Sequence, residues 1–243
     1  MEGMANIQKL ARQALKTFKT ASGLPLKENL DLLMSMMGAI TAEDVNLTPP
    51  TRERRLSYPG EAPVSHVDIL ECPYFSMAVF IVSKGRKLPL HDHPGMYGFC
   101  KVLYGSIQVN MYGTIDSEHE NTNGAVANHN EMEPRKFLYQ GKHIFDSDNG
   151  VCVVSPSHGN LHSIHAINGP AAFLDILGPP YSTEKGRDCL YYKECHREDI
   201  VDKQSNVIYL KEIPCPQEFF CNSQAYRGPV VKYEDIMQPE EEE

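Results

Sequence analysis

The strongest constraint on this chain is the pattern of its apolar residues between positions 66 and 213. The apolar runs there are short and rich in Val, Ile, Phe and Tyr, and Gly, Asn, Asp or Pro separates them about every ten residues. No helical periodicity interrupts them. A chain of 243 residues with 41% hydrophobic content can bury one sizeable core. The pattern predicts an all-β core, a barrel or sandwich, with strands near residues 77–82, 101–112, 136–144, 151–155, 161–167, 171–177 and 206–210.

The first 48 residues differ from this core and are expected to be helical. Their apolar residues recur at spacings typical of amphipathic helices. Residues 49–65, rich in proline and charge, are expected to form a linker loop. The β domain should extend over residues 66–235, and residues 236–243 should be a disordered acidic tail. We therefore expect one β domain that carries an N-terminal helical extension, residues 1–48.

Composition excludes several classes of partner. The formal charge is −9 and the basic residues are scattered, so a nucleic-acid-binding surface is not expected. The seven cysteines form no CxxC pair, which suggests reduced thiols inside a cell. No membrane span or secretory signal is recognisable. The acid-free stretch 3–26 faintly resembles a mitochondrial transit peptide, but it also suits a packed helix. We expect a cytoplasmic protein that could also occur in the nucleus. Nothing in the sequence requires an assembly larger than a monomer.

Two histidines, His91 and His93, lie two positions apart in the segment LPLHDHPG. On a strand such residues face the same side, so both imidazoles can converge on one metal ion inside a barrel. The segment SPSHGNLHSIHAIN offers a third ligand among His158, His162 and His165. On a strand His162 and His165 point to opposite faces, so at most one of them can join the pair.

A site of three histidines leaves three positions open on an octahedral metal ion, enough for a substrate and dioxygen. Such a site has no carboxylate ligand, so the metal ion keeps its full positive charge and should bind an anionic substrate such as a thiolate. Imidazoles also suit zinc, copper and nickel, so the ligand type does not identify the metal. His119 and His129 lie in the polar stretch 113–133 and are expected to be solvated loop residues.

The residues around these histidines resemble the two motifs of the cupin family. The first motif is matched in order by Gly85, His91, His93, Gly98 and Gly105, and the second by Pro156, Gly159 and His162. The resemblance favours His162 as the third ligand and leaves His165 as a core residue or a neighbour of the ligands. It implies a cupin fold, a jelly-roll-like double-stranded β-helix barrel. Cupins place a metal-binding glutamate where this chain has Gly98.

Four longer blocks, HDHPGMYGFCKVLYG, NLHSI, GPAAFLDILGPPY and GRDCLYY, resemble the thiol dioxygenase family of 2-aminoethanethiol (cysteamine) dioxygenase and the plant cysteine oxidases. The resemblance implies an oxidoreductase with Fe(II) held by His91, His93 and His162. Such an enzyme adds both atoms of O2 to the thiol of cysteamine, or of a protein N-terminal cysteine. The product is a sulfinic acid, hypotaurine or N-terminal cysteine sulfinic acid, and N-terminal oxidation feeds oxygen-dependent degradation.

The same resemblance places further residues near the substrate. Asp175 interrupts an apolar strand and could hold a substrate ammonium group, although a loop backbone or a surface arginine could also be its partner. The family resemblance adds Tyr181 beside the substrate. Cys189 and Tyr191 are implied as a thioether crosslink, with a buried cysteine beside a core aromatic as the alternative. Departures from the animal enzymes, Tyr97 and His165, could alter the pocket entrance.

Two rival functions remain open at this point. One is a different cupin enzyme with zinc or another non-redox metal, such as an isomerase or a decarboxylase. The other is a non-enzymatic cupin that binds a small molecule or a partner protein. A binding protein would not need all three histidines, and a zinc enzyme would not consume oxygen.

Overall fold

The computed structural model describes residues 4–50, 62–115, 133–195 and 206–238. Helices α1 (Asn6–Phe18) and α2 (Lys27–Gly38) and the 3-10 turn η1 (Glu43–Val45) precede the strands β1 (Val64–Glu71), β2 (Ser76–Val82), β3 (Lys87–Asp92), β4 (Tyr97–Thr114), β5 (Arg135–Asp146), β6 (Cys152–Val154) and β7 (Leu161–Gly178). The turn η4 (Thr183–Lys185), strands β8 (Tyr191–Cys195), β9 (Val207–Ile213) and β10 (Cys221–Ser223) and helix α3 (Tyr233–Met237) follow.

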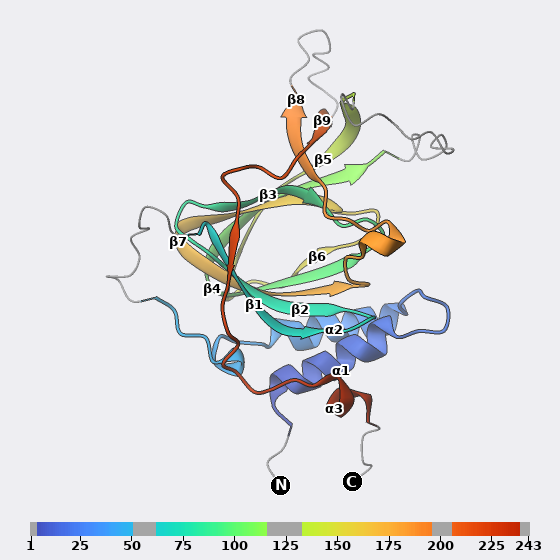
Figure 1. Ribbon diagram of the computed structural model, residues 1–243, viewed down its shortest axis with the longest axis vertical. Coiled ribbons are helices and arrows are strands. Elements are labelled where there is room, and N and C mark those ends of the chain that lie inside the picture. Colours follow the sequence, from blue (N-terminus) through green and yellow to red (C-terminus); the bar gives the residue numbers. More distant parts are fainter. Residues whose placement is uncertain (1–3, 51–61, 116–132, 196–205, 239–243) are drawn as a thin grey trace.

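The strands form one sheet that closes into a barrel. Its order is β10-β1-β2-β7-β3-β8-β9-β5-β4-β6, and an additional pairing of β7 with β4 closes it. Every pairing except β1 with β10 is antiparallel. In Figure 1, β3 lies on one side of the barrel, and β1, β2 and β4 lie on the other. The prediction of an all-β cupin barrel with N-terminal helices is confirmed.

The two longest strands, β4 and β7, run antiparallel through both halves of the barrel. Both bend where Gly105 lies opposite residues 168–170. Gly105 has φ +76°, and a Cβ there would lie 2.4 Å from the Pro170 carbonyl oxygen, so only glycine fits. On β7 Asn168 also has positive φ. The predicted runs 161–167 and 171–177 are therefore one bent strand, because the residues between them turn the chain without ending its pairing to β4.

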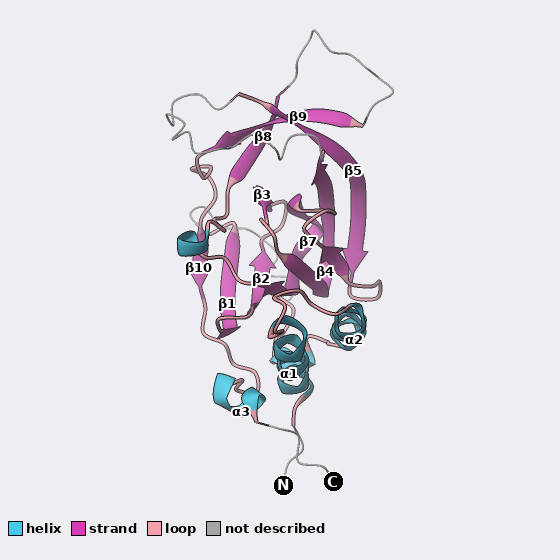
Figure 2. Ribbon diagram, turned by 90° about the vertical axis from the view of Figure 1, so that its right-hand side faces the viewer, coloured by secondary structure: helices cyan, strands magenta, loops and turns pink. Residues whose placement is uncertain are grey.

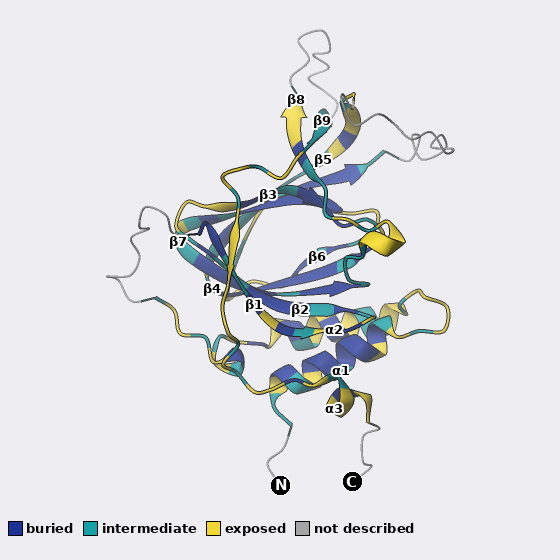
Figure 3. Cartoon of the chain, viewed as in Figure 1, coloured by how far each residue is buried: buried dark blue, intermediate teal, exposed yellow. Residues whose placement is uncertain are grey.

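The N-terminal helices cover the outer face of the sheet half that contains β2 (Figure 2). On α1, Ile7, Leu10 and Ala14 are fully buried and belong to the same apolar cluster as Phe99 and Leu174 of the barrel. The buried side of the helix faces the strands (Figure 3). Burying a leucine or isoleucine side chain stabilises a fold by about 1.5–3 kcal/mol, so the helices stabilise the barrel directly.

The predicted boundaries fall partly outside the described residues. Most of the predicted linker and the last five residues of the predicted tail are not described, and neither are His119 and His129. Two edges differ from the prediction. Val64 already begins β1, and Ile236 belongs to α3, where it is 3% exposed because α3 packs on α1. In the described ranges, no helix has the length and apolar character needed to cross a bilayer.

Candidate metal centre and substrate pocket

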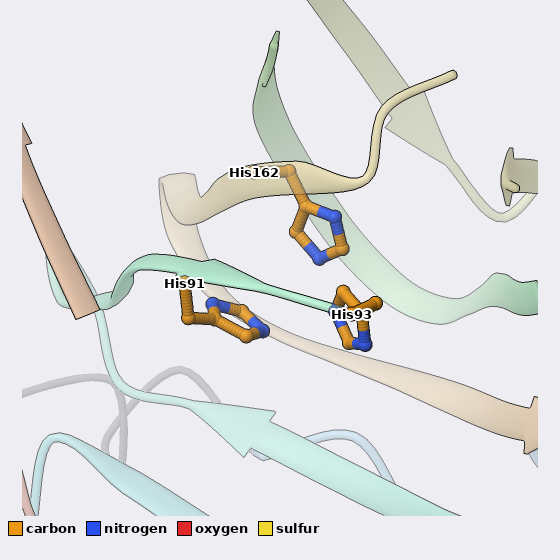
Figure 4. Close-up of side chains that lie close together, drawn as sticks. All are labelled: His91, His93 and His162. Atoms are coloured by element: carbon orange, nitrogen blue, oxygen red, sulfur yellow. The ribbon is translucent and has the colours of Figure 1, made fainter. Parts of the chain in front are cut away.

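Three histidines meet inside the barrel (Figure 4). His91 lies on β3, His93 follows the end of that strand, and His162 lies on β7 directly opposite His91 in the strand register. Their ring centroids are 4.7–4.9 Å apart. Each ring offers one nitrogen, and these atoms lie within 4.8 Å of one another. All three side chains are buried. The three nitrogens are therefore close enough together to hold one metal ion.

Hydrogen bonds on the outer side of each ring determine which nitrogen is free. The Nδ1 of His91 lies 2.8 Å from the Pro89 carbonyl oxygen, and the Nδ1 of His162 lies 3.2 Å from that of Gly159. A carbonyl oxygen only accepts, so both Nδ1 atoms carry the hydrogen. Each Nε2 therefore has a free lone pair. Metal-ligating histidines are commonly oriented in this way.

In His93 a tyrosine hydroxyl binds Nδ1 and leaves Nε2 with a free lone pair. The Tyr181 hydroxyl donates to the Asp92 carbonyl oxygen at 2.6 Å, and its oxygen accepts the Nδ1 hydrogen of His93 at 2.9 Å. The Nε2 of His93 is buried and has no hydrogen-bond partner among the described residues. An unpaired buried nitrogen is costly in a folded protein, and a metal ion would satisfy it. The three histidines thus fit a metal ion.

Burial keeps the imidazoles neutral. It lowers the pKa of His162 to about 3, with a further contribution from His91. The pKa of His93 is well below its ordinary value because of burial and the other two histidines. The pKa of His91 is also lowered by burial, against the opposing hydrogen bond to Pro89. Neutral imidazole is the form that binds metal, so near pH 7 the cluster is ready to do so.

No carboxylate joins the cluster in the described part of the chain. Gly98, in the cupin glutamate position, lies on β4 between β6 and β7. A Cβ at Gly98 would be 2.6 Å from Cγ2 of Val154 and 3.0 Å from Cδ2 of Leu177. Apolar side chains thus fill the space that a glutamate would need. The packing around Gly98 therefore leaves no room for a glutamate ligand beside the three histidines.

Changing Gly98 to alanine is therefore expected to destabilise the fold by about 1–3 kcal/mol, the usual cost of overpacking a core. Chemical denaturation of the metal-free protein would measure this. Gly150, which has open space around its Cα, is the matched site for an alanine control, although its φ of +30° adds some strain. Equal stability of the Gly98→Ala variant and the wild type would contradict the packing argument.

A pocket of about 200 Å³ opens beside the three histidines. The other predicted site residues, Asp175, Tyr181, Cys189 and Tyr191, all line it. The remaining walls are mostly apolar side chains, Phe80, Leu88, Pro89, Ile164, Phe173, Leu177, Phe219 and Cys221. A larger hollow of about 540 Å³, between residues 45–48 and 224–227, has no histidine, cysteine or acid in its lining. The chemistry is therefore concentrated in the smaller pocket.

Asp175 is the acidic residue of this pocket. Burial raises the pKa of its carboxyl from the ordinary 3.8 to about 7. Within the described residues it has no hydrogen bond or ion pair, which excludes there the loop and arginine partners considered from the sequence. Alternation along β7 places it beside Phe173 and Leu177 on the pocket face. A half-buried carboxyl that lines a pocket and has no partner among the described residues is a candidate functional group.

The other histidines of the second motif lie apart from the cluster. His165 pairs in register with Lys87 and Gln108, is half-buried, and does not line the pocket. Burial and then the charge of Lys87 lower its pKa. His158 is exposed in a turn. Tyr97 packs against the apolar cluster between the N-terminal helices and the barrel, and it does not line the pocket. Neither departure from the animal enzymes therefore forms part of the pocket lining.

Sequence reasoning missed Asn160. Its side-chain amide donates to the His93 carbonyl oxygen at 2.6 Å, and the His93 N–H donates to the Asn160 carbonyl oxygen at 2.9 Å. The buried pair joins the end of β3 to the start of β7, two residues before His162. The partners are 67 positions apart, so no local spacing could have revealed the contact.

Comparison with known proteins identifies the family. The PCO_ADO family model matches residues 36–231. The 2-aminoethanethiol dioxygenases of Mus musculus and Homo sapiens are 36% and 33% identical, and each alignment covers 93% of this chain and 96% of the relative. Plant cysteine oxidase 2 of Arabidopsis thaliana is 27% identical over 93% of this chain and 83% of its own length. The chain therefore belongs to the PCO_ADO family and is a cupin dioxygenase, with a cluster of three histidines that fits a metal ion.

Proposed function

We propose that this protein is an iron(II) thiol dioxygenase that acts on an aminothiol, either cysteamine or the N-terminal cysteine of a protein. It would add both atoms of O2 to the sulfur and release hypotaurine or an N-terminal cysteine sulfinic acid. The observation that carries the proposal is the pocket itself. One cavity of about 200 Å³ brings three neutral imidazoles together with a carboxyl that has no partner among the described residues.

Iron is proposed because of the reaction class. Three imidazoles also suit zinc or copper, but zinc has no redox chemistry, and the curated relatives are named as dioxygenases. When bound, iron(II) supplies the redox chemistry that allows a thiol and dioxygen to combine. His91, His93 and His162 would hold it. Since no carboxylate shares the site, a substrate thiolate would bring the anionic charge.

The protein residues would bind and orient the substrate. Asp175 would accept the ammonium group, which would lower the pKa of its carboxyl and keep it charged. Cysteamine and an N-terminal cysteine both place two carbons between sulfur and nitrogen, so one carboxylate serves either. The apolar walls, including Phe80, Ile164 and Phe173, would keep water away from the reacting sulfur.

Tyr181 would orient a metal ligand as well as line the pocket, so Tyr181→Phe is expected to weaken metal affinity about 10–100-fold. The change removes the hydroxyl that accepts the Nδ1 hydrogen of His93 and keeps the ring. Competition with a chelator of known affinity measures the effect. Tyr226→Phe is the control, because the Tyr226 hydroxyl has no partner in the described ranges and the residue lines the separate hollow. Equal affinity in both variants would contradict this role.

We also propose a thioether between the Cys189 sulfur and a ring carbon of Tyr191. The S–H bond and one ring C–H bond would break, and O2, the proposed co-substrate, would take up the two electrons and two protons released. Both side chains line the pocket, and burial raises the pKa of the Cys189 thiol to about 11, against hydrogen bonds with Tyr181 and Tyr191 that lower it. The proposed compartment is the reducing cytoplasm, since all seven cysteines are free thiols. The proposed active form is the monomer.

One experiment tests the function directly. The iron-loaded protein is incubated aerobically with cysteamine, free cysteine, a Cys-initiated peptide and the same peptide with serine first. Oxygen uptake and a product heavier by two oxygen atoms are expected for cysteamine, the Cys peptide, or both. The zinc-loaded protein and the serine peptide should give neither. Absence of oxygen uptake with every thiol would reject the proposal, and oxidation of free cysteine alone would replace its substrate.

A further inference from the structure

The pocket wall that carries Cys189 and Tyr191 is joined to the histidine strand by little backbone pairing. β3 and β8 are matched at a single register position, His91 opposite Tyr191. Residues 188–190, just before β8, belong to no strand or helix. Other contacts must therefore hold this wall beside the histidine cluster.

Asp92 supplies such contacts. Its carboxylate is buried, and its two oxygens have different donors, the Leu190 N–H at 2.9 Å and the Tyr192 hydroxyl at 3.1 Å. The Asp92 N–H donates in turn to the Leu190 carbonyl oxygen at 3.1 Å. Asp92 and Leu190 thus form a closed pair of hydrogen bonds, and the pocket residues Cys189 and Tyr191 are the immediate neighbours of Leu190.

Asp92 also reaches the side of the pocket formed by Tyr181. The Tyr181 hydroxyl donates to the Asp92 carbonyl oxygen at 2.6 Å and orients His93. Arg135 approaches the Tyr192 hydroxyl at 3.4 Å and extends the network toward the surface. A carboxylate is costly to bury, and an apolar side chain would fill the same place without that cost. The buried carboxylate of Asp92 is explained by the two donors that it orients, the Leu190 N–H and the Tyr192 hydroxyl.

We propose that Asp92, acting through Leu190 and Tyr192, is a positioning residue that holds the Cys189–Tyr191 wall against the histidine cluster. The inference rests on the proposed function only for the identity of the substrate that this wall contacts. The carboxylate of Asp92 is not part of the histidine cluster, and Asp92 does not line the pocket. Without its carboxylate the wall opens locally, while the barrel, whose β4–β7 pairing is separate, stays folded.

The rate at which Cys189 is alkylated tests this in protein produced without iron, where the proposed thioether has not formed and the Cys189 thiol is free. In the wild type this thiol is half-buried and its pKa is raised to about 11, so iodoacetamide should modify it slowly. Tyr192→Phe and Asp92→Asn remove or alter a hydrogen bond to a charged group, which corresponds to about a tenfold change in local opening. Mass spectrometry of the peptide that contains Cys189 should show a rate increase of that order in both variants.

Tyr112→Phe is the matched control. Tyr112 is buried in the same apolar cluster as Tyr192, and its hydroxyl also donates to a carboxylate, that of Glu194 at 2.7 Å. This variant should lose a similar amount of thermal stability and leave the alkylation of Cys189 at the wild-type rate. Unchanged alkylation in Tyr192→Phe, or an equal increase in Tyr112→Phe, would overturn the proposal. The milder Tyr192→Phe decides the question where Asp92→Asn fails to fold.

Kinetics of the iron-loaded variants give the second readout. A displaced wall should raise KM for the thiol about tenfold in Tyr192→Phe, while metal content stays at the wild-type level. A purely structural role would lower the melting temperature and leave KM unchanged. A protein without oxygenase activity would reject the proposed function, and the alkylation result would still stand for or against Asp92.

Discussion

Changing His162 to alanine is expected to abolish stoichiometric metal binding and to lower kcat/KM for an aminothiol by more than about 100-fold. The removal of a mere hydrogen-bond partner of a ligand costs 10–100-fold, and His162 is one of three residues that offer a nitrogen to the ion. Two imidazoles alone would leave the metal weakly held. Elemental analysis after gel filtration and oxygen-electrode rates measure the two effects.

His165→Ala is the matched control for this experiment. His165 lies three residues further along β7 in the same histidine-rich segment, but it is not part of the cluster and does not line the pocket. The variant should keep its metal and its activity. If His165→Ala lost the metal and His162→Ala retained it, the assignment of the third ligand would be reversed.

Changing Asp175 to asparagine is expected to raise KM for cysteamine about 100-fold, while the turnover of an amine-free thiol such as 2-mercaptoethanol changes little. Truncating one member of a buried charge pair costs about 2–5 kcal/mol, and only a substrate with an ammonium group forms that pair. Asp68→Asn is the control, because Asp68 lies on β1 and its side chain is exposed. An equal loss for both thiols would show that Asp175 does not bind the amine.

The same variant should be more stable than the wild type in its metal-free form above pH 7. The pKa of Asp175 is about 7 in the fold, above its ordinary 3.8, so charging the carboxyl opposes folding. Stability from the neutral form is fully present below about pH 4 and is lost as pH rises through 7. Asparagine removes this loss, on the order of 2–4 kcal/mol. The denaturation curves of Asp175→Asn and of the wild type should coincide at pH 4 and differ at pH 8.

Local sequence patterns predicted those features that depend on local geometry. Alternation and turn residues located strands near β2, β5 and β9, and the i, i+2 spacing of His91 and His93 anticipated two rings that point toward each other. Alternation also placed Asp175 with Phe173 and Leu177, and all three line the pocket. Short-range periodicity is sufficient for such inferences.

Contacts between distant segments could not be predicted in this way. Tyr181 and His93 are 88 positions apart, and Asp92 and Tyr192 are 100 apart. The register of β3 and β8 brings the latter pair together, and no spacing within either segment reveals it. The bend of β7 was also missed, because Asn168, Gly169 and Pro170 read as a turn between two strands. Cross-strand pairing kept the chain in one strand instead.

The bent strand β7 has a consequence for substrate choice. His162 and Asp175, the groups proposed to meet the sulfur end and the nitrogen end of the substrate, stand on this one strand on either side of the bend at residues 168–170. Both halves are paired to β4, and Gly105 permits the close approach of β4 to the bend. The distance between these two residues is thus set by paired strands and not by loops. If His162 and Asp175 bind the substrate as proposed, we expect the bend to set how many carbons can separate its thiol from its amine.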